Sequence, residues 1–112
     1  MTAAVRVRGL YAVTPDTTDT IGLAEWVEAA LAGGAALVQY RNKTADPSLR
    51  TAQARALQSI CKARAVPLII NDYPDLVATV GADGLHVGQR HTRYAAHPYS
   101  FRQIADFTVM IF

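Results

Sequence analysis

Two polar clusters, each directly behind a short apolar run, carry the residue types that could hold a charged ligand. The first follows residues 35–38 and consists of Gln39, Tyr40, Arg41, Asn42 and Lys43. The second follows residues 67–70 and consists of Asn71 and Asp72. Cationic side chains suit phosphate oxygens, and Mg²⁺ accepts a carboxylate beside phosphates and water. Together the clusters predict a site for a diphosphate held with a metal ion.

Four short apolar segments are expected to be the strands that position these clusters. They span residues 9–13, residues 35–38 or slightly beyond, a segment that begins at Pro67, and residues 84–88. Residues 14–16, Thr-Pro-Asp, are typical of the turn that ends a strand. Both polar clusters therefore follow the end of a predicted strand.

Helices are expected between these strands. The first has a buried face formed by Leu23, Trp26, Val27, Ala30 and Leu31 and ends at Gly33-Gly34, because glycine accepts a left-handed helix end. The second starts at Asp46-Pro47, an N-cap acceptor followed by a proline. Its buried stripe contains Leu49, Ala52, Ala56, Leu57, Ile60 and Cys61. A third, shorter helix is expected from Pro74 to near Gly81.

Strands that alternate with helices at this interval predict an α/β fold made of parallel βα units. Right-handed crossovers place successive strands side by side. Ligands of such sheets bind where the strands end and the following helices begin. The two polar clusters are therefore expected to meet at one edge of the sheet.

The composition of the chain is that of one globular domain. It has 112 residues, of which 51% are hydrophobic and 18% are charged. No apolar run approaches the ~20 residues that span a bilayer. The first residues lack a secretion signal and the single Cys61 cannot form an internal disulfide, so we expect a cytoplasmic protein. A net charge of +2 is too small to favour nucleic acid or a membrane as partner.

Four stretches of this sequence resemble the family of the thiamine phosphate synthases and thiazole tautomerases. They are residues 10–14, residues 33–35 with 38–43, residues 66–72 and residues 81–89. The order and spacing of these stretches make the resemblance specific, although a lone Gln-x-Arg-x-Lys pattern would be weak.

The resemblance implies a TIM (β/α)8 barrel that joins two thiamine precursors. Diphosphate leaves hydroxymethylpyrimidine diphosphate, and the ring nitrogen of a thiazole phosphate takes its place. The segment Gln39, Tyr40, Arg41, Asn42 and Lys43, together with Asn71, would bind the pyrimidine diphosphate, and Asp72 would bind Mg²⁺. No catalytic residue is assigned. The intact set favours the synthase over the tautomerase branch, which does not need the pyrimidine diphosphate.

The sequence departs from the family pattern after Gln89. The family's second metal-binding aspartate corresponds to His91, a poor Mg²⁺ ligand, and the later strands with the thiazole-phosphate contacts are not found. We therefore expect residues 1–89 to be the N-terminal half of the barrel, about four strands, and residues 90–112 to be a divergent, frameshifted or disordered tail.

Two explanations of this departure stay open. The first is a frameshift, a truncated gene or a gene-model error, which would leave an incomplete and inactive enzyme. The second is a natural half-barrel or assembly subunit that pairs with itself or another chain through its exposed sheet edges.

Several other residues allow structural interpretations. Arg41 and Lys43 could be solvated loop charges, and Asn71 with Asp72 could form a turn before the third helix. His86 is expected to be a packed or hydrogen-bonded strand residue, Gln89 could shape a loop, and Cys61 is expected to be inert core.

Overall fold

The part of the chain that the structure describes forms a mixed sheet with three helices. The structure, a computed structural model, describes residues 10–86, 100–104 and 107–111. Its elements in chain order are Leu10–Val13 (β1), Thr20–Ala32 (α1), Ala35–Tyr40 (β2), Pro47–Ala63 (α2), Leu68–Asn71 (β3), Pro74–Val80 (α3), Gly84–His86 (β4), Ser100–Ile104 (β5) and Phe107–Ile111 (β6).

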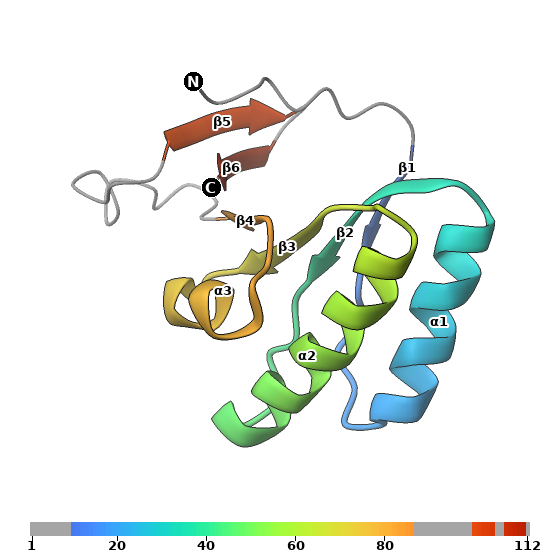
Figure 1. Ribbon diagram of the computed structural model, residues 1–112. Helices are drawn as coiled ribbons and strands as arrows, with labels where there is room; N and C mark the ends of the chain where they lie inside the picture. The colour runs from blue at the N-terminus through green and yellow to red at the C-terminus, as the bar shows by residue number, and fades with distance from the viewer. Residues whose placement is uncertain (1–9, 87–99, 105–106, 112) are drawn as a thin grey trace.

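The first four strands are parallel neighbours in chain order. The described strands form one sheet with the order β1-β2-β3-β4-β6-β5, in which β6 is antiparallel to both β4 and β5. The three helices lie on the same side of the four parallel strands (Figure 1), as expected when every crossover has the same hand. The α/β prediction with parallel βα units is therefore confirmed for β1 to β4, and the eight-stranded barrel stays a prediction.

The C-terminal strands differ from what the sequence led us to expect. Residues 107–111, which belong to the segment expected to be a divergent tail, form the strand β6. We did not predict β5, nor the antiparallel pairing of β6 with β4. This pairing covers one edge of the parallel strands, and β1 lies at the other end of the strand order. Association through a sheet edge stays a prediction.

Local chemistry at the helix ends sets where each helix begins and stops. The Asp46 side chain accepts a hydrogen bond of 2.8 Å from the Leu49 N–H and caps α2. Asp19 caps α1 by the same bond, 3.0 Å long, to the Gly22 N–H. Gly34 after α1 and Gly81 after α3 have φ values of 98° and 70°, which glycine adopts without steric cost. These caps fix where each helix leaves the sheet edge.

The core lies between the helices and one face of the sheet. Val38, Tyr40, Leu68, Ile70 and Leu85 come from the strands and are buried with residues of all three helices. Side chains alternate between the faces of a strand. Leu37, Gln39 and Ile69 therefore lie on the opposite face, where each is also buried.

Two positions on the predicted helix stripes were assigned wrongly. Trp26 was expected in the core, yet 39% of its surface is exposed, whereas Leu23, Val27 and Leu31 are buried as predicted. Ala52 in α2 is exposed and its neighbour Gln53 is fully buried at 0%. The stripe of α2 was misplaced because a search for apolar residues passes over a buried glutamine.

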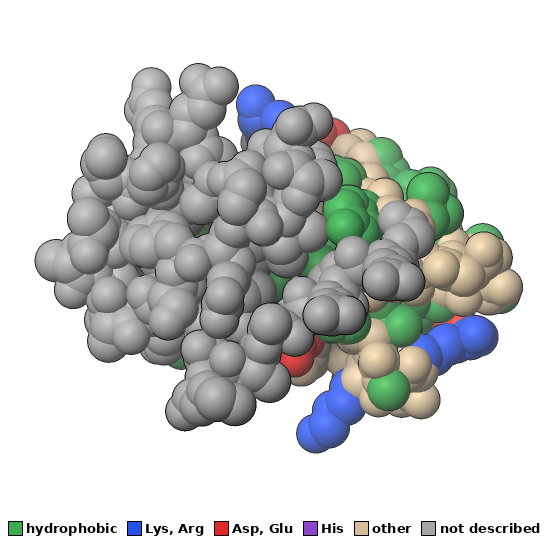
Figure 2. Space-filling view, turned by 90° about the horizontal axis from the view of Figure 1, so that it is seen from above, with side chains coloured by type: hydrophobic (Ala, Val, Ile, Leu, Met, Phe, Trp, Pro, Cys, Tyr) green, Lys and Arg blue, Asp and Glu red, His purple; other side chains and the backbone are tan. Residues whose placement is uncertain are grey.

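The view from above shows hydrophobic side chains gathered on the described part of the surface, with Lys and Arg side chains at its margin (Figure 2). Large exposed apolar residues include Leu10, Ile21 and Trp26. In the described ranges, none of the helices combines the length and the apolar character needed to cross a membrane.

Candidate functional site

The alternation of β2 divides the first polar cluster between two faces of the sheet. Gln39 lies opposite Val13 of β1 and Ile69 of β3, on the face away from the helices. Tyr40 is the next residue and points toward α2, where its hydroxyl meets Gln53. Neighbouring residues of one motif therefore face different surroundings.

Tyr40 and Asn42 belong to a buried hydrogen-bond network around Gln53. The Tyr40 hydroxyl donates to Gln53 Oε1 at 2.6 Å, and Asn42 Nδ2 donates to the same oxygen at 2.8 Å. Gln53 Nε2 in turn donates to the Thr17 carbonyl at 3.0 Å. Burial raises the pKa of Tyr40 to about 12, so its hydroxyl keeps its proton and remains a donor.

Asn42 uses its remaining polar atom within the chain as well. Asn42 Oδ1 accepts from the N–H of Thr44 at 3.0 Å and from the Thr44 hydroxyl at 2.7 Å, and Asn42 is only 4% exposed. Tyr40 is 1% exposed. The side chains of Tyr40 and Asn42 therefore hold the loop together, and their predicted part in ligand binding stays a prediction.

Arg41 and Lys43 are held at the end of β2 by the loop that follows β1. The Arg41 N–H donates to Thr14 Oγ1 at 2.9 Å, and the Thr14 hydroxyl donates back to the Arg41 carbonyl at 3.1 Å. The Lys43 N–H donates to Asp16 Oδ1 at 2.9 Å. The backbone of this loop is fixed while the Lys43 side chain is exposed and the Arg41 side chain is partly buried.

Sequence reasoning missed Gln53, Thr14 and Asp16 as residues that shape this edge. The turn residues Thr14 and Asp16 were noted only as the end of the first strand. A polar residue at position 53, one helical turn before Leu57 and two before Cys61, was the available signal for Gln53.

Asn71 and Asp72 lie at the end of β3 and are both contacted by His86 of β4. The register pairs Asn71 with His86, and Asn71 Oδ1 lies 3.0 Å from His86 Nδ1. The Asp72 N–H donates to the His86 carbonyl at 3.0 Å. Asp72 has a φ of 69°, a left-handed conformation that aspartate adopts more readily than most residues. The prediction that His86 is a hydrogen-bonded strand residue is confirmed.

Three influences act on the pKa of the His86 side chain. Burial lowers the pKa of His86, the Asp72 carboxylate raises it and the Arg41 guanidinium lowers it further. Arg41 and Asp72 therefore act on the same imidazole, although one follows β2 and the other follows β3. Because β2 and β3 are parallel neighbours with Tyr40 opposite Ile70, Arg41 and Asp72 leave the sheet at the same edge.

Tyr73 is held next to Asp72 by a contact with α2. The Arg50 guanidinium lies over the Tyr73 ring, 3.8 Å from its centroid, in a cation–π arrangement. Arg50 also donates to the Ala45 carbonyl at 3.0 Å. The loop that carries Asp72 is thus supported by His86 on one side and by Arg50 on the other.

Among the described residues at this edge, Asp72 offers a carboxylate that could bind a magnesium ion. In the described ranges, no group of three or more His, Cys, Asp and Glu side chains is placed to hold a metal. Asp72 supplies an exposed carboxylate, and Mg²⁺ is commonly bound by one or two carboxylates together with substrate phosphates. Gln89 and His91 lie outside the described residues, so the predicted mismatch at His91 stays a prediction.

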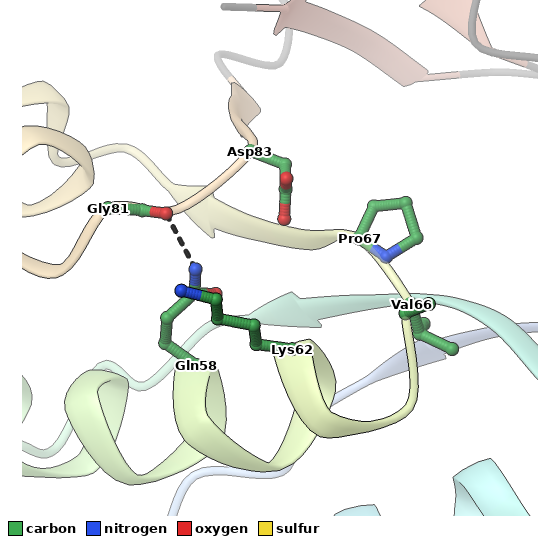
Figure 3. Close-up of a pocket in the computed structure, with 7 residues that line it drawn as sticks. Gln58, Lys62, Val66, Pro67, Gly81 and Asp83 are labelled. Carbon is green, nitrogen blue, oxygen red and sulfur yellow. Dashed lines mark hydrogen bonds between the residues drawn. The ribbon is translucent and has the colours of Figure 1, made fainter.

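A hollow of about 410 Å³ lies at the opposite end of the sheet, beside the residues that precede β3 and β4 (Figure 3). Gln58 Nε2 donates to the Gly81 carbonyl at 2.6 Å across it. The Asp83 carboxylate accepts from the Leu68 N–H at 2.8 Å. Both groups join structural elements, and ligands of parallel α/β sheets bind at the other end. We therefore assign no site to this hollow.

Comparison with known proteins agrees with the resemblance found in the sequence. Residues 10–103 match the sequence profile described as thiamine monophosphate synthase. The thiamine-phosphate synthase of Janthinobacterium sp. (strain Marseille) is 55% identical over 82 residues, which cover 73% of this chain and 40% of that protein. That of Nitrosomonas eutropha is 49% identical over 92 residues, which cover 82% of this chain and 43% of that protein.

The profile match extends past residue 89, where sequence reasoning placed a domain boundary, so that boundary stays a prediction. The chain spans about two fifths of the length of these curated relatives. The profile covers well over half of the chain. This chain therefore belongs to the thiamine monophosphate synthase family.

Proposed function

We propose that this chain carries the pyrimidine-diphosphate half of a thiamine phosphate synthase site. The observation that supports this most is the parallel register of β2, β3 and β4, which brings Arg41 and Asp72 to the same edge of the sheet. The whole enzyme would couple hydroxymethylpyrimidine diphosphate to a thiazole phosphate and release diphosphate. Such a role in biosynthesis suits a cytoplasmic protein.

In this proposal the residues that face away from the helices bind the substrate. Arg41 and Lys43 pair with the phosphates, and Gln39 and Asn71 donate or accept hydrogen bonds around the pyrimidine diphosphate. Fixed cations favour bond breaking because they stabilise charge where it develops on the leaving group. The backbone of Arg41 and Lys43 is already held by hydrogen bonds to Thr14 and Asp16, so little reorganisation of this loop accompanies binding.

The bond between the pyrimidine's methylene carbon and the diphosphate oxygen breaks, and its electron pair leaves with that oxygen. The thiazole nitrogen then forms the new bond to carbon. Asp72 is the residue that would hold Mg²⁺, which when bound neutralises part of the diphosphate charge. An electron-rich pyrimidine tolerates the developing positive charge, so stabilisation of the leaving group is the main contribution of the protein.

Calorimetry with hydroxymethylpyrimidine diphosphate, in the presence and absence of Mg²⁺, tests this proposal. We expect Mg²⁺ to strengthen binding. We expect Asp72→Asn to lower the affinity measured with Mg²⁺ about tenfold, equivalent to about 1.4 kcal/mol. Asp75→Asn is the matched control, because Asp75 lies in the first turn of α3 on the same connection. Tighter binding of a thiazole phosphate than of the pyrimidine diphosphate would contradict the proposal and favour the tautomerase branch.

A further inference from the structure

His86 contacts both Asn71 and Asp72, the residues of the second polar cluster. The proposed function does not assign it a role in binding or catalysis. Its ring nitrogen Nδ1 lies 3.0 Å from Asn71 Oδ1, and its carbonyl accepts from the Asp72 N–H at 3.0 Å. Both contacts cross between neighbouring parallel strands in register. The side chain of His86 therefore acts on Asn71, and its backbone acts on Asp72.

We propose that His86 is a positioning residue whose Nδ1–H donates to Asn71 Oδ1 and so turns the Asn71 NH₂ group toward the bound ligand. This inference deepens the proposed function and rests on it for the identity of the ligand. A carboxamide has an acceptor on one side and donors on the other. Its orientation is therefore decided by the neighbour that holds one side.

The geometry supplies the reason why a histidine serves here and an apolar residue would not. Gln39, Asn71 and His86 share the face of the sheet that points away from the helices. An Nδ1–H donor favours the Asn71 oxygen and disfavours the reversed amide, whose NH₂ group would meet the N–H. An apolar side chain of similar size would fill the space and leave both orientations accessible.

Asparagine and glutamine at position 86 separate this role from simple packing. The side-chain NH₂ of asparagine lies near the place of histidine Nδ1, whereas that of glutamine lies near the place of Nε2. We expect His86→Leu and His86→Gln to weaken binding of the pyrimidine diphosphate about fivefold, the size of one lost hydrogen bond. His86→Asn should restore binding to within about twofold. Equal losses in all three variants would overturn the proposal.

A double-mutant cycle asks whether the effect passes through Asn71. If it does, His86→Leu costs little further affinity in an Asn71→Ala background, because coupled residues are not additive. Additive losses would contradict the role. Thermal unfolding of each variant, with the backbone hydrogen bond to Asp72 retained, checks that the fold is intact.

Nuclear magnetic resonance of the free protein tests the same contact without any ligand. The ¹⁵N shifts of the ring should show the Nδ1–H tautomer of His86, assigned by its loss in His86→Asn. An Nε2–H tautomer would overturn the positioning role even if the pyrimidine diphosphate binds. Absence of ligand binding together with the Nδ1–H tautomer would instead contradict the proposed function and support the contact.

Discussion

The two faces of the sheet at the end of β2 differ in how their polar residues are used. On the helix side, Tyr40 and Asn42 are nearly fully buried and bound to Gln53. On the other side, Asn71 of β3 lies opposite His86 of β4, with 3.0 Å between Asn71 Oδ1 and His86 Nδ1. Within β2, the alternation of strand side chains places Gln39 and Tyr40 on opposite faces.

We therefore expect substitutions on the helix side to lower mainly the stability of the fold, and substitutions of Arg41 and Lys43 to lower mainly the affinity for the ligand. Substitutions on the helix side should lower the free energy of unfolding, since they leave buried polar groups without hydrogen-bond partners. Substitutions of Arg41 and Lys43 should leave the fold intact, because their backbone contacts to Thr14 and Asp16 do not use their side chains.

The largest effect on stability is expected at Gln53. Gln53→Ala leaves the buried Tyr40 hydroxyl without its acceptor and opens a cavity, and we expect a loss of about 3 kcal/mol in the free energy of unfolding. Urea denaturation measures this change. Gln58→Ala in the same helix is the control and should cost less than about 1 kcal/mol, because the Gln58 hydrogen bond is exposed. Equal losses of unfolding free energy in Gln53→Ala and Gln58→Ala would contradict a particular contribution of the helix-side network to stability.

Tyr40→Phe should have a smaller effect that depends on pH. It removes one hydrogen bond near neutral pH and is expected to cost about 1 kcal/mol. The wild-type Tyr40 has its pKa raised from 10.0 to about 12, so the folded state keeps a proton that the unfolded state loses. Stability should therefore fall as pH rises from 10 to 12.

Burial also raises the pKa of Cys61 from 9.0 to about 11. This thiol therefore adds a further loss of folding stability as the pH rises from 9 to 11. Tyr40→Phe should consequently reduce the alkaline loss without abolishing it. Denaturation curves at a series of alkaline pH values would show this, and an unchanged alkaline loss in Tyr40→Phe would count against burial of the hydroxyl.

Much of the fold could be predicted because its signals are local. Asp46 before Pro47 and glycine at position 81 fix helix ends through a cap and a left-handed backbone. The convergence of Arg41 with Asp72 could also be predicted, since parallel strands end at one edge. The antiparallel placement of β6 could not, because strand pairing over a long connection depends on contacts that no local pattern encodes.

The division of the motif was harder to predict for a physical reason. The strand was expected to end near Val38, and the faces of Tyr40 and Asn42 follow only if it continues to Tyr40. The partner that draws them inward is Gln53, a polar residue at a position where helix patterns lead one to expect an apolar side chain. Sequence reasoning therefore grouped all five residues as one site.

The most direct test compares Arg41→Ala/Lys43→Ala with Arg55→Ala/Lys62→Ala, an equal change of charge on the exposed surface of α2. Titration with Mg²⁺ and hydroxymethylpyrimidine diphosphate is combined with urea denaturation of the same samples. We predict that the first variant loses at least about tenfold in affinity, that the second keeps its affinity, and that both unfold within about 0.5 kcal/mol of the wild type. Unchanged affinity in a folded Arg41→Ala/Lys43→Ala variant would contradict the account.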